Sequence, residues 1–571
     1  MKKIKYITLA VVALLVGIWL PSCTDLTEEP FSVLTDDTYF TDKAAVEAAV
    51  LRPFQYAHNN AWDGDRWRLQ ELTGDHFVWT QKGKHGWDEG QWVRLHGHNW
   101  DYKEGQVYGS WRDLYKGIGY INKVLLDFEK YDIIALGVAE SEKAGYVAQL
   151  RVLRAWYYIW LLDLFRYIPI VEDISSMVGQ STPQETFNYI EKEIKEAMPN
   201  LPEKGTTYRF TKTAAASLLV RIYFSAGIWV EKPMYTECAQ VAQDIIDGKY
   251  GVSHSIDPDY RGPFHRSFVG DPSPENIFEF PHKRNYLQLG GMYAPFHHYK
   301  SNSILDTDGD NGYNGIHLTP SRDPDGNLYT YKMGGPYEKY ADVDYRKQNY
   351  EVINENGDTK GFFLVGPQYE FNRAKGYGYD KDKPVTGSEE WTGQQLVFVD
   401  QVGRFSEKPG GRWTEGSHVT TGEENSGVRL MKFGPLSHTH SLYYANSIGE
   451  IRLAEIYYSL AECKYRAGDK AGAAKLLDAV RKRNYPEAEW SKYSYEANLS
   501  MLTDQEFIDE WGREFLGEHR RRIDLIRWNR FGDEWWDKSI DKDDKEYTIF
   551  PIPDRFLNAN NLLKQMIRGW E

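Results

Sequence analysis

Apolar residues recur every three or four positions along several stretches of the chain, and this spacing predicts amphipathic helices. In residues 145–166 one helical face carries Leu150, Leu153 and Tyr157, and Pro169 follows at a position where a helix cannot continue. The same pattern predicts further helices over 44–50, 187–194, 213–229 and 235–247. The first third of the chain is therefore expected to be helical.

A helical pair is predicted near the C-terminal end. One helix runs from Ile451 to Tyr465, the turn Ala467-Gly468-Asp469 follows, and a second helix runs from Lys470 to Arg483. The large and small apolar residues in the pair follow the spacing of a tetratricopeptide repeat. A hairpin of this kind cannot bury its apolar face alone, so other helices are expected to stack on it.

The middle of the chain has a different pattern. Residues 251–450 hold more than half of the 49 glycines, together with many Pro, Asp, Asn and Tyr residues. Such a composition predicts long loops with short strands, for example Gln395–Val399. Long irregular stretches in a compact protein are usually functional. We therefore expect a helical scaffold that carries a loop-rich region.

The N-terminus has the pattern of a secretory leader. Basic Lys2, Lys3 and Lys5 precede an apolar run of 15 residues, which is too short to span a bilayer. The sequence Leu-Pro-Ser-Cys ends at Cys23 and resembles a bacterial lipobox, which predicts a signal peptide over 1–22 and acyl chains on Cys23. The alternative is an ordinary signal peptide that happens to contain a cysteine.

Composition and charge narrow the function further. The 68 basic and 83 acidic residues give a net charge of −15, which argues against a nucleic-acid-binding protein. The three cysteines exclude a disulfide framework. Cys238 and Cys463 lie in helical patterns and are interpreted as buried free thiols, although a disulfide between them stays an alternative. Aromatic residues are abundant, at 15% of the chain.

Seven segments, in this order, resemble the SusD/RagB family of outer-membrane lipoproteins of Bacteroidota. Besides the lipobox they are AQLRVLRAWYYIWLLDLFRYIPIV (148–171), RFTKTAAASLLVRIYFSAG (209–227), IRLAEIYYSLAECKYRAG (451–468), LLDAVRKRN (476–484), EWGREFLGEHRRRIDLIRW (510–528) and FPIPDRFLNANNLLKQ (550–565). The resemblance covers essentially the whole chain. The central loops match poorly, and the C-terminal segment departs from the family pattern.

The resemblance implies a mainly α fold, a tetratricopeptide-repeat-like helical scaffold with a loop-rich irregular insertion carrying short strands. It divides the chain into a signal peptide (1–22), a lipid-anchored tether (23–40), an N-terminal helical region with a Trp-rich binding loop (41–250), a loop-rich variable region (251–445) and a C-terminal tetratricopeptide-like helical region (446–571).

The resemblance also implies a function. The protein would be a non-catalytic lipoprotein on the cell surface, held at the outer membrane by lipid on Cys23. It would capture an oligosaccharide or polysaccharide and deliver it to a SusC-like TonB-dependent transporter. The family does no chemistry on its ligand and uses no cofactor.

Candidate ligand-binding residues come from the distribution of tryptophan. The segment from Trp62 to Trp111 holds seven of the 19 tryptophans, in a stretch that partly lacks a helical apolar period. Indole rings stack on the apolar face of a sugar, while polar side chains bind its hydroxyls. We select Trp79, Trp87 and Trp92, with Asn99 as a polar partner; the alternative is that each ring packs in the core.

A second aromatic patch extends from Tyr286 to Tyr299 and includes Tyr293. The glycines and proline within it predict a shaped loop, which could face the first patch and complete an aromatic cradle. Simple loop packing is the alternative. Tyr293 is the residue of this patch that we select as a ligand-binding candidate.

Two groups of acidic residues bear on metal binding and on catalysis. The alternating Asp306, Asp308 and Asp310 resemble part of a calcium loop, but the glycine is one position late and His317 stands where a glutamate is required. An exposed acidic turn is the better interpretation, and no metal is expected. Paired carboxylates such as Glu514 and Glu518 lie among arginines, which suits structural ion pairs better than a general acid.

Three alternatives to glycan capture remain. The first is a RagB-like protein that binds peptides within the same uptake architecture. The second is a surface glycoside hydrolase on a helical scaffold. The third is a pure scaffold whose helical hairpins bind only proteins.

Overall fold

The computed structural model describes residues 40–62, 64–173, 175–265, 272–282, 294–309, 312–405, 416–441, 443, 448–541 and 546–566. The predicted signal peptide at 1–22, the lipidation of Cys23 and nearly all of the tether therefore lie outside the described residues. Tyr293 also lies outside them.

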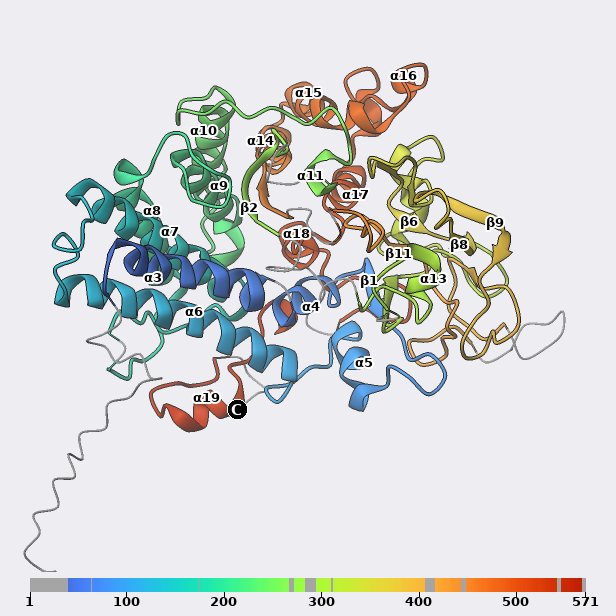
Figure 1. The fold of residues 1–571 in the computed structure, drawn as a ribbon, viewed down its shortest axis with the longest axis horizontal. Coiled ribbons are helices and arrows are strands. Elements are labelled where there is room, and N and C mark those ends of the chain that lie inside the picture. The colour runs from blue at the N-terminus through green and yellow to red at the C-terminus, as the bar shows by residue number, and fades with distance from the viewer. Residues whose placement is uncertain are drawn as a thin grey trace, which may run out of the picture.

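A stack of antiparallel helices forms one half of the molecule (Figure 1). Its helices are α3 (Lys43–Tyr56), α6 (Gly105–Lys130), α7 (Glu140–Phe165), α8 (Pro183–Ala197), α9 (Lys212–Trp229), α10 (Tyr235–Ile246), α14 (Leu453–Arg466) and α15 (Lys470–Arg481). Each of α6 to α10 packs against the next, and α10 packs against α14, which pairs with α15. The predicted fold class, mainly α with a tetratricopeptide-like scaffold, is confirmed.

The sequence explains where these helices begin and end. The Asp42 carboxylate accepts a hydrogen bond from the Ala45 amide at 2.9 Å and caps α3. Helix α7 ends at Phe165, because Arg166 adopts a left-handed backbone conformation ahead of Pro169. Helix α9 is apolar on all sides, as expected for a helix packed between neighbours.

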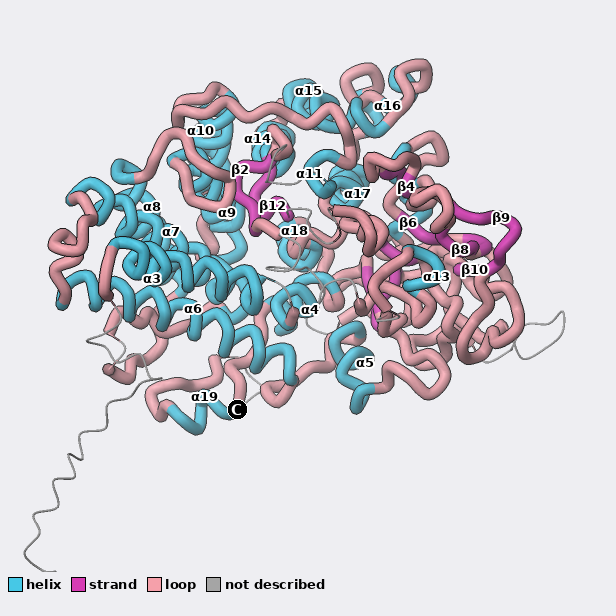
Figure 2. Tube along the Cα trace, viewed as in Figure 1, coloured by secondary structure: helices cyan, strands magenta, loops and turns pink. Residues whose placement is uncertain are grey.

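The loop-rich region lies beside the helical stack and contains only short strand pairs among its described residues (Figure 2). Its strands are β3 (Ile316–Leu318), β4 (Glu351–Val352), β5 (Thr359–Lys360), β6 (Phe363–Leu364), β7 (Gly366–Pro367), β8 (Tyr369–Phe371), β9 (Tyr379–Pro384), β10 (Val397–Phe398) and β11 (Arg429–Leu430). The strand predicted at Gln395–Val399 shortens to β10, which pairs with β7. A separate apolar cluster, which includes Tyr350, Leu396 and Phe398, gives this region its own core.

The two ends of the loop-rich region are joined inside the helical stack. Strand β2 (Asn276–Phe280) pairs antiparallel with β12 (Ile448–Arg452), and α14 follows β12 directly. The predicted helix start at Ile451 is therefore wrong, because Ile451 and Arg452 pair with Phe278 and Asn276 in the sheet. This pairing brings the chain back to the stack after the long irregular excursion.

Buried ion pairs connect the two halves. Glu514, at the end of α17 (Asp504–Glu514), pairs with Arg346 of the loop-rich region at 3.2 Å, with Arg452 of β12 at 3.1 Å and with Arg483 at 2.9 Å. All four side chains are nearly inaccessible to solvent. The interpretation of Glu514 as part of structural ion pairs agrees with these contacts.

The remaining elements fill the junction and the C-terminal end. The helices are α4 (Asp65–Glu71), α5 (Gln91–His96), α11 (Gly262–His265), α13 (Ser301–Leu305), α16 (Trp490–Tyr493), α18 (Arg521–Arg527) and α19 (Asp554–Ala559).

Cys238 and Cys463 are both buried and free, in agreement with the thiol interpretation. Among the described residues, no helix is long and apolar enough to cross a bilayer.

Candidate functional site

The Trp-rich segment lies where the helical stack meets the loop-rich region. It consists of β1 (Phe77–Trp79), a tight loop, the short helical turn at Asp88–Gly90 and α5. Strand β1 pairs antiparallel with β3, so Trp79 lies opposite Ile316. Helix α5 packs back onto β1, and Figure 1 shows the two elements as neighbours at the edge of the loop-rich region. Residues from both halves of the molecule therefore shape this surface.

Two of the three selected tryptophans are buried. Trp79 and Trp92 stack with ring centroids 4.2 Å apart and an interplanar angle of 7°, and their exposed fractions are 8% and 5%. Pairing of β1 with β3 covers the Trp79 ring, since Gly315 lies directly against it. The Trp92 Nε1 donates to the Asp88 carboxylate at 2.7 Å. The expectation that these two rings face solvent is wrong.

Trp87 has its ring at the surface, with an exposed fraction of 50%. The three residues that follow it, Asp88, Glu89 and Gly90, all have positive φ angles. This conformation is costly for Asp88 and Glu89, and such strain is common at functional sites. The turn is braced by Arg94, whose Nη1 donates to the Glu89 carbonyl at 2.8 Å. The indole is thus presented by a constrained turn.

His85 and Trp391, which sequence reasoning did not select, lie in or near this segment. The His85 ring lies 5.5 Å from that of Tyr299, the last residue of the second aromatic patch. His85 Nε2 also lies 3.2 Å from the Glu389 carboxylate. The described end of the second patch therefore meets the Trp-rich segment. Trp391 is half-buried in the same loop as Glu389. Its position as a single tryptophan between Gly387 and Gly393 is the sequence feature from which it could have been selected as a candidate.

A buried carboxylate organises the loop that carries Trp391. Glu424 accepts hydrogen bonds from the backbone amides of Ser388 at 2.8 Å and Trp391 at 2.6 Å, and lies 3.0 Å from His298 Nε2. Burial alone would raise the pKa of Glu424, but the hydrogen bonds from His298 and the loop amides outweigh it and lower that pKa. The ionised carboxylate holds the loop in one conformation.

Asn99 is exposed, and its side-chain amide donates to the Gly97 carbonyl at 2.9 Å. This contact closes the turn after α5. The carboxylate of Asp306 also has hydrogen-bond partners within the protein. One of its oxygens accepts from Arg373 Nε at 2.6 Å, and the other accepts from the Ser437 hydroxyl. Asp306 is thus buried and held by protein donors, so the expectation of an exposed turn is wrong for this residue.

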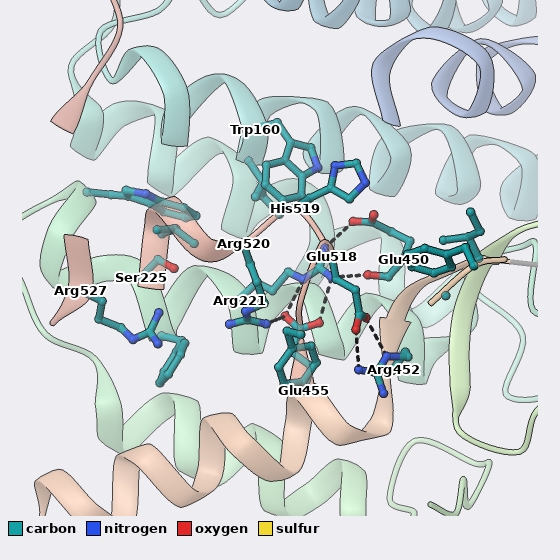
Figure 3. Close-up of a pocket in the computed structure, with 18 residues that line it drawn as sticks. Trp160, Arg221, Ser225, Glu450, Arg452, Glu455, Glu518, His519, Arg520 and Arg527 are labelled. Carbon is teal, nitrogen blue, oxygen red and sulfur yellow. Dashed lines mark hydrogen bonds and ion pairs between the residues drawn. The ribbon is translucent and has the colours of Figure 1, made fainter. Parts of the chain in front are cut away.

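A second region with many charged groups lies inside the helical stack (Figure 3). It surrounds a cavity of about 50 Å³. Arg221 pairs there with Glu455 at 2.8 Å, and Arg452 pairs with Glu518 at 2.8 Å. Burial would raise the pKa of Glu455, but Arg221 outweighs it and the pKa falls. A carboxylate that is held ionised between arginines is unsuited to act as a general acid.

Comparison with known proteins places the chain in a family. Residues 274–570 match the model of the SusD family. Residues 41–224 match the model of a family described as starch-binding and associating with the outer membrane. The starch-binding protein SusD of Bacteroides thetaiotaomicron is 23% identical over 517 residues, which span 87% of this chain and 83% of SusD.

Solved structures share the fold. A laminarin-binding SusD-like protein has a TM-score of 0.62 at 18% identity, with coverage of 92% of this chain and 99% of that one. The surface glycan-binding protein A of Bacteroides thetaiotaomicron, in complex with laminarihexaose, has a TM-score of 0.61, 18% identity and the same coverage. Because the first family model spans more than half of the chain and the folds agree, this protein belongs to the SusD family.

Proposed function

We propose that this protein captures a glycan at the cell surface and binds it through the surface around Trp87. The observation that carries the proposal is the exposed fraction of that ring, 50%, on a turn held by left-handed residues at the junction of the two halves. Exposed indole is costly in water and is well suited to pack against a sugar ring. The family membership and the glycan-binding relatives support this assignment.

The neighbourhood of Trp87 supplies polar groups of the right kind. His85 and Glu389 are both partly exposed, and either can exchange hydrogen bonds with sugar hydroxyls. Trp79 and Trp92 would serve as a rigid layer beneath the site and would not touch ligand. Asn99 and Tyr293 stay predicted ligand residues, the latter outside the described residues.

Binding without cleavage is the second part of the proposal. Glycoside hydrolysis requires two carboxyl groups across the scissile bond, one of them protonated at working pH. The exposed carboxylate beside His85 belongs to Glu389, and hydrogen bonds from Lys84 and His85 lower its pKa. Such a group is poorly suited to donate a proton. Burial raises the pKa of the neighbouring Glu390, so the proposal of binding without cleavage is supported by membership of the SusD family.

Delivery to a transporter completes the proposed role. Acyl chains on Cys23 would hold the protein at the outer membrane, since each buried methylene contributes about 0.8 kcal/mol. A SusC-like TonB-dependent transporter would then receive the glycan. The match to a family described as associating with the outer membrane supports this location.

The first experiment measures binding and cleavage together. The mature chain without its leader is titrated calorimetrically with neutral α- and β-glucans and with mixed peptides, and the same mixtures are assayed for new reducing ends. We expect heat of binding with at least one glycan and no reducing ends. Binding of peptides but no glycan, or steady release of reducing ends, would contradict the proposal.

A further inference from the structure

A groove of about 570 Å³ opens on the helical stack, on elements other than those that carry Trp87. It lies between the C-terminal ends of α7, α9 and α18 and the N-terminal end of α8, and Figure 1 labels all four helices. The uncharged polar side chains that line it are those of Tyr167, Thr182, Gln184, Asn529 and Thr548. Its apolar wall includes Trp229, Ile526 and Phe531.

Arg166 lines this groove and is 7% exposed. Its Nη1 donates to the Leu162 carbonyl at 2.9 Å, and its guanidinium forms no ion pair with a described carboxylate. A buried charge without a partner of opposite sign is unfavourable, because it has lost its hydration without a compensating attraction. The site around Arg166 is therefore short of one negative charge.

The neighbouring acidic side chains supply only part of this missing negative charge. Asp163 is the nearest buried acid on α7, but Arg522 already pairs with it at 3.0 Å. The Asp163 carboxylate also accepts from the Trp229 indole at 3.1 Å and from the Gln70 amide at 2.6 Å. Burial lowers the pKa of Arg166 to about 10, while the Asp163 carboxylate raises this pKa and the Arg522 guanidinium lowers it. The Asp163 carboxylate thus forms an ion pair with Arg522 and attracts Arg166 without forming a second ion pair.

Residues with positive φ angles lie around the groove at the ends of three helices. Arg166, Glu231 and Asn529 all line it, and all three have left-handed φ angles of 62°, 56° and 54°. Residues other than glycine adopt this region rarely. Each of the three lies at or just beyond the C-terminal end of α7, α9 or α18, where a positive φ commonly ends a helix, so these helix ends form the rim of the groove.

We infer that this groove binds an acidic sugar, with the carboxylate of a uronic acid on the Arg166 guanidinium and the ring hydroxyls on the polar side chains around it. Arginine binds carboxylates in a bidentate manner, and a single buried cation suits a single acidic group. The volume suits a ligand of one or two sugar rings. Gln184, Asn529 and Thr548 offer the amide and hydroxyl groups that sugar hydroxyls require. The site is separate from the Trp87 surface and does not depend on it.

The test titrates the mature chain with glucuronate, galacturonate, neutral glucose and inorganic sulfate, followed by calorimetry and by ligand-detected NMR. We expect binding of at least one uronate, with neutral glucose and inorganic sulfate at least tenfold weaker. Equal binding of glucose or of sulfate, or no uronate binding, overturns the inference.

Three variants locate the site. Arg166→Gln is expected to weaken uronate binding at least tenfold, while Arg112→Gln, which removes an exposed positive charge on α6, leaves it unchanged. Glu231→Gln removes an exposed acid at the groove and is expected to strengthen binding about two- to fivefold. Unchanged affinity in Arg166→Gln overturns the inference. If that variant does not fold, unchanged or weaker binding by Glu231→Gln overturns it.

Discussion

At the scale of single residues, the tryptophans of one short segment have different surroundings. Trp79 and Trp92 form a closed stack under 10% exposed, whereas Trp87, five residues before Trp92, has half of its surface in water. The stack contributes burial and ring contact to stability, while the exposed ring contributes little. The same residue type thus supports the fold at two positions and presents an exposed ring at a third.

Replacement of Trp92 by Ala is expected to lower the free energy of unfolding by about 3–5 kcal/mol, because it removes a large buried ring and leaves Trp79 without its partner. Trp87→Ala is the matched control and is expected to cost less than about 1 kcal/mol. Chemical denaturation followed by circular dichroism measures both. Equal losses in the two variants would contradict the assignment of stack and surface.

The sequence predicted the cluster of tryptophans but could not rank their exposure. Burial of Trp79 depends on Gly315 and Ile316, more than 200 positions away, which pair β3 against β1. No local pattern reports that contact. The positive φ angles after Trp87 accompany a local hydrogen bond from Arg94 to the Glu89 carbonyl, and the residue types Asp88 and Glu89 give no signal of them. The contacts of His85 with Tyr299 and Glu389 join positions more than 200 residues apart, so they too were not predicted.

At the scale of elements, the helices followed from local pattern because their apolar spacing and caps are encoded within a few residues of each other. The helices predicted over 145–166 and 213–229 have bounds that differ by only a few residues from those of α7 and α9. The start of α14 was misplaced because β12 uses Ile451 and Arg452 to pair with β2, a long-range contact. The short strands of the loop-rich region depend on such contacts throughout.

The buried ion pairs at the end of α17 lead to a prediction about how the elements are held together. Glu514→Gln is expected to lower the free energy of unfolding by about 3–5 kcal/mol, because Arg346, Arg452 and Arg483 would lose a shared buried carboxylate. Glu489→Gln, in an exposed pair with Lys492, is the control and is expected to change stability by less than about 1 kcal/mol. Denaturant titration at neutral pH compares them. A loss in Glu514→Gln no larger than in the control would show that these pairs do not hold the halves together.

At the scale of the whole molecule, buried carboxyl groups with shifted pKa values set the dependence of stability on pH. Burial would raise the pKa of Glu510, but Arg481 and Arg513 outweigh it and lower the pKa from 4.5 to about 2. Burial raises the pKa of Glu71 from 4.5 to about 8. The two glutamates therefore act in opposite pH ranges.

Stability is expected to be greatest near pH 5. The contribution of Glu510 is present above pH 4.5 and is lost as the pH falls from about 4.5 to 2, since the unfolded chain then binds the proton first. The contribution of Glu71 is present below pH 4.5 and is lost as the pH rises from 4.5 to about 8, because the folded state keeps the proton longer. Unfolding free energies from pH 2 to 9 measure the profile. Glu71→Gln should flatten the decline above pH 5, and an unchanged decline would contradict the role of Glu71.

The central claim is that the exposed indole of Trp87 holds a glycan. Calorimetric titration of the preferred glycan into the mature chain, Trp87→Ala and Trp490→Ala tests it most directly, since Trp490 is a partly exposed tryptophan on the distant α16. We predict at least roughly tenfold weaker binding for Trp87→Ala, or about 1.4 kcal/mol, and an unchanged affinity for Trp490→Ala. Equal affinity of Trp87→Ala and the unaltered protein, with both folded, would contradict the account.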